Sequence, residues 1–177
     1  MAKPDFWKNN KRYYDLKSYW RNLFGCNVHK LAIDAGFTCP NRDGHVATGG
    51  CIYCDGRGSK LRQLGALPSI TDQIVSGKKY YQPSASKFIA YFQTFTNTYA
   101  PVDQLRSLYD EALAEQDVIG LSIGTRPDCL GPDVIELLSG YAKKHHIWVE
   151  LGLQSVHDKT LQVINRGHNY QQFLDAV

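Results

Sequence analysis

The stretch that decides this fold is Cys39-Pro40-Asn41-Arg42-Asp43-Gly44-His45-Val46-Ala47-Thr48-Gly49-Gly50-Cys51-Ile52-Tyr53-Cys54. Cys51 and Cys54 form a C-x2-C pair, and eleven residues separate Cys39 from Cys51. The Asn-Arg-Asp-Gly and Gly-Gly segments between the cysteines are typical of turns, so this loop can fold back on itself. We therefore expect the three thiols to reach one metal ion or one face of a cluster.

Three thiols in one loop are compatible with several kinds of site. A structural zinc site usually has four ligands, and His45 would have to be the fourth. A dithiol redox site would use only the C-x2-C pair. An iron–sulfur cluster is held by Cys thiolates, usually four, so three would leave one iron open to another ligand. Buried cysteines without a function are disfavoured, because a loop rich in Gly, Asn and Asp offers little core. The cysteines alone do not separate zinc from iron–sulfur.

The residues around the cysteines resemble one superfamily. Tyr53, directly before Cys54, matches the C-x-aromatic-C element of radical S-adenosylmethionine enzymes. Their usual first gap is shorter than the gap of eleven here, which resembles a subgroup related to the radical domain of the Elongator catalytic subunit. Within that subgroup, the string Asp34-Ala35-Gly36-Phe37-Thr38-Cys39-Pro40-Asn41-Arg42-Asp43-Gly44 resembles the YhcC-type bacterial radical enzymes.

The resemblance covers almost the whole chain. It continues through Tyr91-Phe92-Gln93, Thr96-Asn97-Thr98-Tyr99-Ala100-Pro101, Gly124-Thr125-Arg126-Pro127-Asp128, Glu150-Leu151-Gly152-Leu153-Gln154 and Asn165-Arg166-Gly167-His168. These strings are specific for the family, and they do not specify a substrate. The last of them is more typical of the end of a helix than of a site.

The resemblance implies two cofactors. Cys39, Cys51 and Cys54 would hold a [4Fe–4S] cluster whose fourth iron binds S-adenosylmethionine. An electron donor such as flavodoxin or ferredoxin would reduce the cluster, and a 5′-deoxyadenosyl radical would then abstract a hydrogen atom from the substrate. The kinship with Elongator suggests RNA as a substrate class. The alternatives are a zinc-binding Cys3His interaction module and an inactive, truncated fragment.

The resemblance also points to side chains that would contact S-adenosylmethionine. Tyr53 would pack near the adenine. Gln93, Thr96 and Asn97 stand where the superfamily usually has a Gly-Gly-Glu-like strand, and Thr125 and Arg126 would contact the ribose or the carboxylate. Glu150 and Gln154 are further candidates, although Glu150, inside a buried strand, must be protonated or paired, and Arg126 or Arg166 could be its partner. No catalytic residue is predicted.

Composition favours one ordinary globular domain. The 177 residues are 43% hydrophobic and 21% charged, which is typical of a folded protein with a sizeable core. The net charge of +3 is compatible with a polyanionic substrate without requiring one. Three of five cysteines lie in one loop and no signal peptide is present, which favours metal ligands in a cytoplasmic protein. No apolar run is long enough to span a membrane.

The chain predicts an α/β fold with parallel strands. Apolar strands are expected at 31–37, 87–95, 117–123 and 147–153. Helices are expected to begin near Ser69, at Pro101 and at Gly131-Pro132, and two more are expected at about 157–164 and 170–177. Each strand ends in a polar segment, and the carboxyl ends of parallel strands form the binding edge of such sheets. We expect a partial TIM-like (β/α) barrel of the radical S-adenosylmethionine type, truncated after about four βα units.

The first 30 residues form a basic and aromatic extension before the expected core of residues 31–177. They interleave Lys8, Lys11, Arg12, Lys17 and Arg21 with Trp7, Tyr13, Tyr14, Tyr19 and Trp20. Such interleaving suits phosphates and stacked bases. A helix that lays Leu16, Tyr19, Trp20 and Leu23 on the end of the barrel is the favoured interpretation.

Overall fold

The computed structural model describes residues 12–55, 66–82 and 84–177. The expectations for Trp7, Lys8 and Lys11 lie outside these residues. Four strands form one sheet in the order β1-β2-β3-β4, and every neighbouring pair is parallel. The strands are β1 (Val28–Ile33), β2 (Lys87–Phe92), β3 (Val118–Thr125) and β4 (His146–Leu151). The predicted α/β class with a parallel sheet is confirmed.

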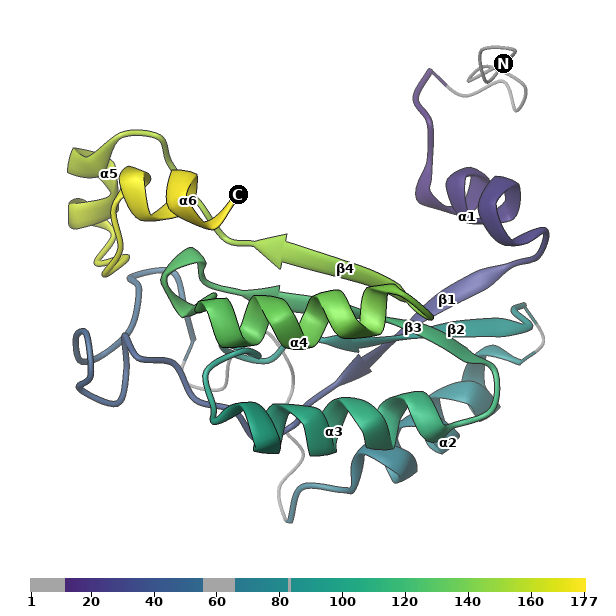
Figure 1. Cartoon of the computed structure of the whole chain (residues 1–177). Coiled ribbons are helices and arrows are strands. Elements are labelled where there is room, and N and C mark those ends of the chain that lie inside the picture. The colour runs from purple at the N-terminus through teal and green to yellow at the C-terminus, as the bar shows by residue number, and fades with distance from the viewer. Residues whose placement is uncertain (1–11, 56–65, 83) are drawn as a thin grey trace.

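Helices α2 (Ile70–Tyr81), α3 (Val102–Ala114) and α4 (Pro132–Ala142) cover one face of the sheet (Figure 1). Their apolar stripes pack on alternate strand residues in one buried cluster, which includes Leu31, Ile33, Ala90, Phe92, Leu121 and Ile123. Because side chains alternate between the two faces of a strand, the residues between these positions point to the other face. That second face carries the polar side chains described below.

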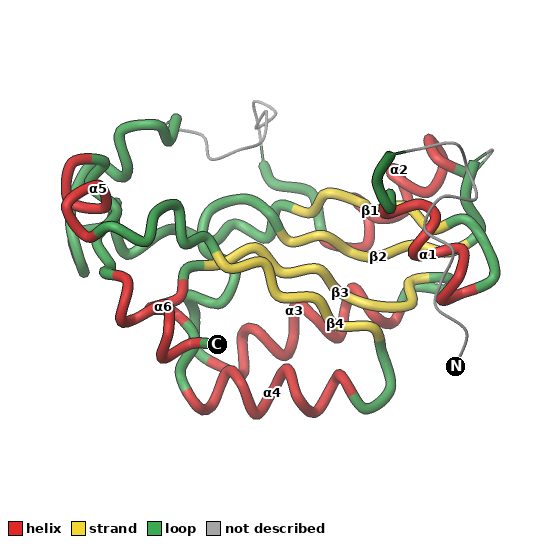
Figure 2. The backbone as a smooth tube through the Cα atoms, turned by 90° about the horizontal axis from the view of Figure 1, so that it is seen from above, coloured by secondary structure: helices red, strands yellow, loops and turns green. Residues whose placement is uncertain are grey.

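Helix α1 (Leu16–Phe24) packs on the second face, at the end of the sheet where the strands begin (Figure 2). Asp15 caps it by accepting a hydrogen bond from the Ser18 N–H at 2.9 Å. Trp20 is buried against Val28 and Ile89. The expected stripe is only partly confirmed. Tyr19 packs with Trp20, whereas the other two predicted members, Leu16 and Leu23, are exposed.

The first strand lies earlier in the chain than predicted. It was expected at 31–37, but β1 ends at Ile33 because the chain turns there. The Asp34 carboxylate accepts a hydrogen bond from the Gly36 N–H at 3.0 Å, and Gly36 has φ of +75°. A side-chain acceptor and a left-handed glycine together form a turn and end the strand. As a result, Lys30, assigned to the N-terminal extension, lies inside the sheet.

Two other strands end earlier than their apolar runs. β2 stops at Phe92, three residues before the expected end, and Phe95 has a positive φ of 63° that no strand residue adopts. β4 stops at Leu151, and Gln154 has φ of 74°. Apolar composition alone did not show these turns. Helices η1 (Pro127–Cys129), α5 (Asp158–Val163) and α6 (Tyr170–Ala176) follow the last two strands.

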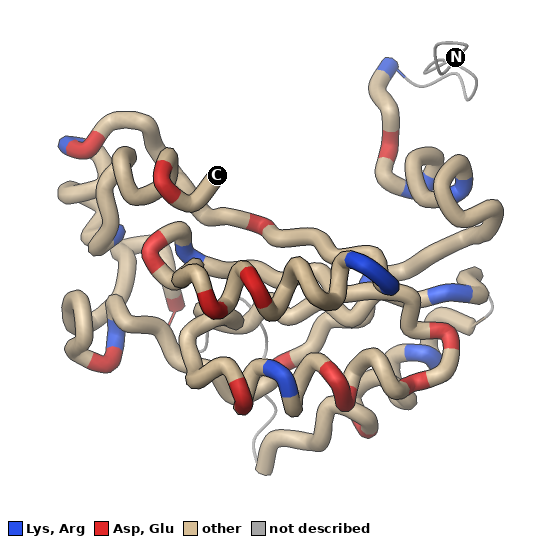
Figure 3. The backbone as a smooth tube through the Cα atoms, in the orientation of Figure 1, with Lys and Arg blue, Asp and Glu red and all other residues tan. Residues whose placement is uncertain are grey.

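Charge is unevenly distributed over the outer helices. Helices α3 and α4 together hold five Asp or Glu residues and one Arg, and Figure 3 shows the acidic residues along both helices in red. This outer layer does not suit a polyanion. In the part of the chain that the structure describes, every helix is too short or too polar to cross a membrane.

Candidate functional site

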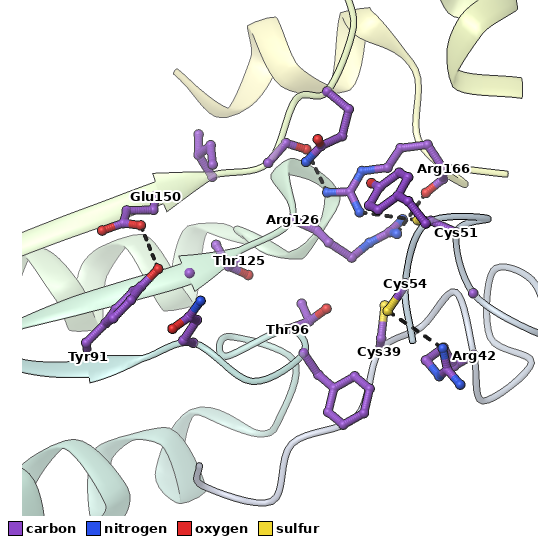
Figure 4. A pocket seen from close by; sticks show the side chains of 18 residues that line it. Cys39, Arg42, Cys51, Cys54, Tyr91, Thr96, Thr125, Arg126, Glu150 and Arg166 are labelled. Carbon is purple, nitrogen blue, oxygen red and sulfur yellow. Dashed lines mark hydrogen bonds between the residues drawn. The ribbon is translucent and has the colours of Figure 1, made fainter. Parts of the chain in front are cut away.

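A cavity of about 390 Å³ lies at the carboxyl ends of the strands (Figure 4). All but one of the residues predicted for the site line it: Cys39, Cys51, Tyr53, Cys54, Gln93, Thr96, Thr125, Arg126, Glu150 and Gln154. Arg42, Tyr91, Phe95 and Arg166 are among the other side chains that line this cavity. The expectation that the loops after the four strands converge on one mouth therefore agrees with the geometry.

The cysteine loop is folded back on itself as its turn residues predict. The Arg42 N–H donates to the Cys39 carbonyl at 2.8 Å, and the Cys54 N–H donates to the Cys51 carbonyl at 2.9 Å. Gly50 has φ of +81°, and a Cβ there would lie 2.7 Å from the Arg42 guanidinium. The positive φ favours glycine at this position, because an L side chain is strained there. Cys51 is buried at 6% exposure, whereas Cys39 and Cys54 are partly exposed.

Nitrogen donors surround two of the three cysteine sulfurs. Asn41 Nδ2 lies 3.5 Å and Arg166 Nη1 lies 3.6 Å from Cys51 Sγ. Arg42 Nη1 lies 3.7 Å from Cys54 Sγ. N–H donors stabilise negative charge on sulfur, so this surrounding suits thiolate ligands. Cysteine thiols with N–H donors around them are the kind of side chains that hold iron–sulfur clusters.

Tyr53 also lies against Cys51. Partial burial and then a hydrogen bond with Cys51 raise the pKa of the Tyr53 phenol to about 12. The phenol therefore stays neutral at physiological pH, and its ring lines the cavity while remaining more than half exposed. Such a ring can pack on another ring without adding charge to the site.

His45 does not join the cysteines. Its ring lies 6.0 Å from the ring of Tyr99, and both residues line a second cavity of about 570 Å³. Across residues 12–55, 66–82 and 84–177, no three His, Cys, Asp or Glu side chains form a group that could hold a metal ion. The same finding covers Cys39, Cys51 and Cys54, so it does not separate a Cys3His zinc site from an iron–sulfur cluster.

Arg166 belongs to the site, although the sequence indicated only the end of a helix. It is 8% exposed and lines the cavity. Its Nη2 donates to the Gly152 carbonyl at 2.6 Å, and its Nε donates to His168 Nε2 at 2.9 Å. These contacts fix the guanidinium in place. The string Asn165-Arg166-Gly167-His168 within the family resemblance was the signal that could have identified it.

The segment that carries Arg166 is bound tightly to the cysteine loop. Asn41 Nδ2 donates to the Asn165 carbonyl at 2.6 Å, and Asn165 Nδ2 donates to the Gly50 carbonyl at 2.8 Å. Gly167 has φ of +77°, and a Cβ there would lie 2.2 Å from Asn41 Oδ1. The two segments therefore position each other, although more than a hundred residues separate them in the chain.

Arg126 is buried and hydrogen-bonds to both Asp128 and the backbone of Arg166. Its Nε and Nη2 donate to the two Asp128 carboxylate oxygens at 2.9 and 2.7 Å, and its Nη1 donates to the Arg166 carbonyl at 2.8 Å. Burial would lower the pKa of Arg126, but the hydrogen bond and charge of Asp128 outweigh it and raise that pKa. Because Asp128 balances its charge, Arg126 fixes the Arg166 segment without leaving a free positive charge in the cavity.

Glu150 has a different partner from those considered in the sequence. Its carboxylate pairs with neither Arg126 nor Arg166. It pairs with Lys30 of β1 and accepts hydrogen bonds from Ser122 Oγ at 2.7 Å and from the Tyr91 hydroxyl at 2.9 Å. The reason is geometric, because these side chains project from β1, β2, β3 and β4 on the same face of the sheet.

This network keeps Glu150 ionised. Burial raises the pKa of Glu150, but the hydrogen bonds from Lys30, Ser122 and Tyr91 outweigh it, so the pKa lies below its usual range. Burial and the hydrogen bond to Glu150 raise the pKa of Tyr91 to about 12. The Lys30 ammonium also lies 4.2 Å from the centre of the Tyr91 ring, a cation–π contact. The Glu150 carboxylate thus lines the cavity and accepts hydrogen bonds from side chains of β1, β2 and β3.

The polar residues after β2 differ in what they contact. Thr96 lines the cavity, as does Gln93. Asn97 is the predicted residue that is not among the lining side chains. It is fully buried, and its amide donates to the Gly124 carbonyl at 2.8 Å. Tyr109 donates to the Asn97 carbonyl at 2.6 Å. These bonds attach the loop after β2 to β3 and so position Thr96.

Comparison with known proteins identifies the family. Residues 39–177 match the model of the Radical SAM superfamily, and the chain therefore belongs to that superfamily. It is 44% identical to YtqA of Bacillus subtilis over 169 residues, which are 94% of this chain and 52% of YtqA. It is 43% identical to YhcC of Escherichia coli K12 over 148 residues, 83% of this chain and 47% of YhcC.

A relative from Methanocaldococcus jannaschii is covered to a similar extent. The chain is 37% identical to MJ0486 of Methanocaldococcus jannaschii over 163 residues, 90% of this chain and 49% of that protein. The chain thus spans about half the length of the curated relatives it matches. The resemblance to YhcC-type proteins is confirmed, and the names of these relatives state no substrate.

Proposed function

We propose that this chain carries the cofactor site of a radical S-adenosylmethionine enzyme. Cys39, Cys51 and Cys54 would hold a [4Fe–4S] cluster, and S-adenosylmethionine would occupy the cavity between these cysteines and the strand ends. The observation that carries the proposal is that the three thiols of one loop line the same cavity as polar side chains from the strand ends. When bound, the cluster supplies one electron that cleaves S-adenosylmethionine to methionine and a 5′-deoxyadenosyl radical.

The residues of the chain bind and orient the two cofactors. Glu150 is ionised and has acceptor capacity beyond its present hydrogen bonds, so it would accept bonds from hydroxyl groups of the cofactor. Gln93, Thr96, Thr125 and Gln154 would supply further polar contacts around the cavity. The neutral Tyr53 ring would pack against the adenine and limit access of water at the exposed side.

Arg126 has a supporting part in this proposal. Its charge is balanced by Asp128, so we assign it to holding the Arg166 segment and not to binding a carboxylate. Thr125 is also held by the protein, because its hydroxyl lies within hydrogen-bond distance of the Thr98 hydroxyl, at 2.6 Å. An electron donor such as flavodoxin or ferredoxin, an RNA substrate and a cytoplasmic location stay predictions of the family resemblance.

The proposal is tested by anaerobic reconstitution with iron and sulfide, followed by iron and sulfide analysis. We expect about four irons per chain and a broad thiolate-to-iron absorption band that bleaches with dithionite. Cys51→Ala should abolish this band, because Cys51 is one of the three proposed ligands. Cys26→Ala is the matched control, since Cys26 packs against Trp20, Val28 and Ile89 and does not line the cavity.

Two outcomes would count against the proposal. A Cys51→Ala protein with the iron content and spectrum of the wild type would contradict the ligand assignment. One equivalent of stable zinc without acid-labile sulfide would instead favour the structural metal site.

A further inference from the structure

We infer that Arg166 and Arg42, together with Asn41, raise the reduction potential of the cluster by donating N–H groups to its cysteine ligands. This inference rests on the proposed function. It assigns to the two arginines, neither of which was predicted from the sequence to be a site residue, a role that is separate from holding S-adenosylmethionine.

The donors are unevenly distributed over the three sulfurs. Cys51 Sγ accepts hydrogen bonds from Asn41 Nδ2 at 3.5 Å and from Arg166 Nη1 at 3.6 Å. Cys54 Sγ accepts a hydrogen bond from Arg42 Nη1 at 3.7 Å. Within the described residues, the structure gives Cys39 no N–H donor of this kind. The side of the site formed by Cys51 therefore carries the greater stabilisation of negative charge.

Arg166 cannot easily turn away from Cys51. Its Nη2 is bonded to the Gly152 carbonyl, and its Nε is bonded to His168. The side chain is buried, and the backbone carbonyl of Arg166 accepts a bond from Arg126. With the other nitrogens of the fork occupied, Nη1 is directed at Cys51 before any cluster is bound. Such preorganised donors outside the ligand sphere tune a metal centre.

Charge determines the direction of the effect. Reduction adds one negative charge to a cluster and its thiolates. A buried guanidinium and an N–H donor both stabilise that added charge more than they stabilise the oxidised state. Hydrogen bonds to the sulfurs are one of the factors that set the potentials of iron–sulfur clusters. The donors should therefore make the cluster easier to reduce by its electron donor.

The test compares the midpoint potentials of reconstituted variants by electron paramagnetic resonance during a reductive titration, with iron counted in each sample. Arg166→Met removes the guanidinium charge and one of the two N–H donors to Cys51, and leaves Asn41 in place. Arg42→Met removes the guanidinium that donates to Cys54. Arg106→Met is the matched control. It deletes the same charge from the exposed face of α3, away from the cavity.

We expect more negative midpoint potentials for Arg166→Met and Arg42→Met than for Arg106→Met, and additive shifts in the double variant, because the two arginines donate to different sulfurs. Arg166→Lys keeps the charge and loses the fork, so its potential should fall between those of the wild type and Arg166→Met. A purely structural loosening would shift the Lys and Met variants equally, which would contradict the inference.

The inference is overturned if both Met variants hold the same iron as the control and share its midpoint potential. If Arg166→Met takes up no iron, Arg42→Met decides alone, because the Arg42 side chain is only partly buried. Among the described residues, it donates hydrogen bonds to Cys54 and the Asp55 carbonyl and lies over the Phe95 ring. A wild-type protein that takes up no cluster would instead refute the proposed function, and the inference with it.

Discussion

The Lys30–Glu150 pair gives a prediction whose size follows from the structure. Lys30→Met should destabilise the fold and remove the ion pair that helps to fix the Glu150 carboxylate. The two side chains are 21% and 37% exposed, so the pair lies between a surface and a buried ion pair. An exposed pair contributes about 0–1 kcal/mol, and breaking a buried one costs about 3–5 kcal/mol. We place the loss at about 1–2 kcal/mol, plus about 0.5–1 kcal/mol for the cation–π contact with Tyr91.

The assay is urea unfolding at several pH values. The folded-state pKa of Glu150 lies below the ordinary pKa of a glutamate, so the stabilisation by Lys30 is fully present at pH values above that ordinary pKa. It is lost as the pH falls through the lower pKa of the folded state. The difference in free energy of unfolding between wild type and Lys30→Met should therefore be largest near neutral pH and shrink in acid.

Lys87→Met is the control, because the Lys87–Asp117 pair has similar chemistry but is 42% and 41% exposed. It should cost less than about 1 kcal/mol. A Lys30→Met protein that is no less stable than Lys87→Met at neutral pH would refute the reasoning. A difference that grows in acid would refute it as well, since that is the opposite sign.

Two further substitutions test the framework around the cavity. Gly167→Ala puts a Cβ 2.2 Å from Asn41 Oδ1 on a backbone with positive φ, so we expect a loss of about 1–3 kcal/mol in urea unfolding and reduced iron uptake. Gly44→Ala, with positive φ but an open surrounding, is its control and should show only the backbone cost. Asp128→Asn leaves the buried Arg126 charge without its carboxylate and should cost about 3–5 kcal/mol. Asp133→Asn, outside this pair, should lower the free energy of unfolding far less. Equal losses for the two Asn variants would contradict the stabilising role of the Arg126–Asp128 ion pair.

Much of the site could be predicted because it depends on local sequence and on one topological rule. The cysteines share a loop of turn residues, so their proximity follows from spacing. Gln93, Thr125 and Gln154 each come just after or at the end of an apolar run, and the carboxyl ends of parallel strands meet at one edge. The observed cavity brings these residues together with the cysteines.

What the sequence did not show depends on register and on long-range contacts. Lys30 and Glu150 are 120 positions apart, and their pairing requires knowledge of which faces of β1 and β4 they occupy. Arg166 looks like the end of a helix, since nothing local shows that its guanidinium reaches Cys51. The strand ends depend on single residues such as Gly36 and Phe95, whose positive φ stops strands that apolar composition would continue.

The most direct measurement of the central claim is the formation of 5′-deoxyadenosine. Reconstituted protein is mixed with S-adenosylmethionine and dithionite under anaerobic conditions, and the products are quantified by liquid chromatography and mass spectrometry. We predict 5′-deoxyadenosine and methionine in equal amounts from the wild type, and neither above background from Cys51→Ala. Wild-type protein with about four irons per chain that forms no 5′-deoxyadenosine would contradict the assignment of this cavity to S-adenosylmethionine.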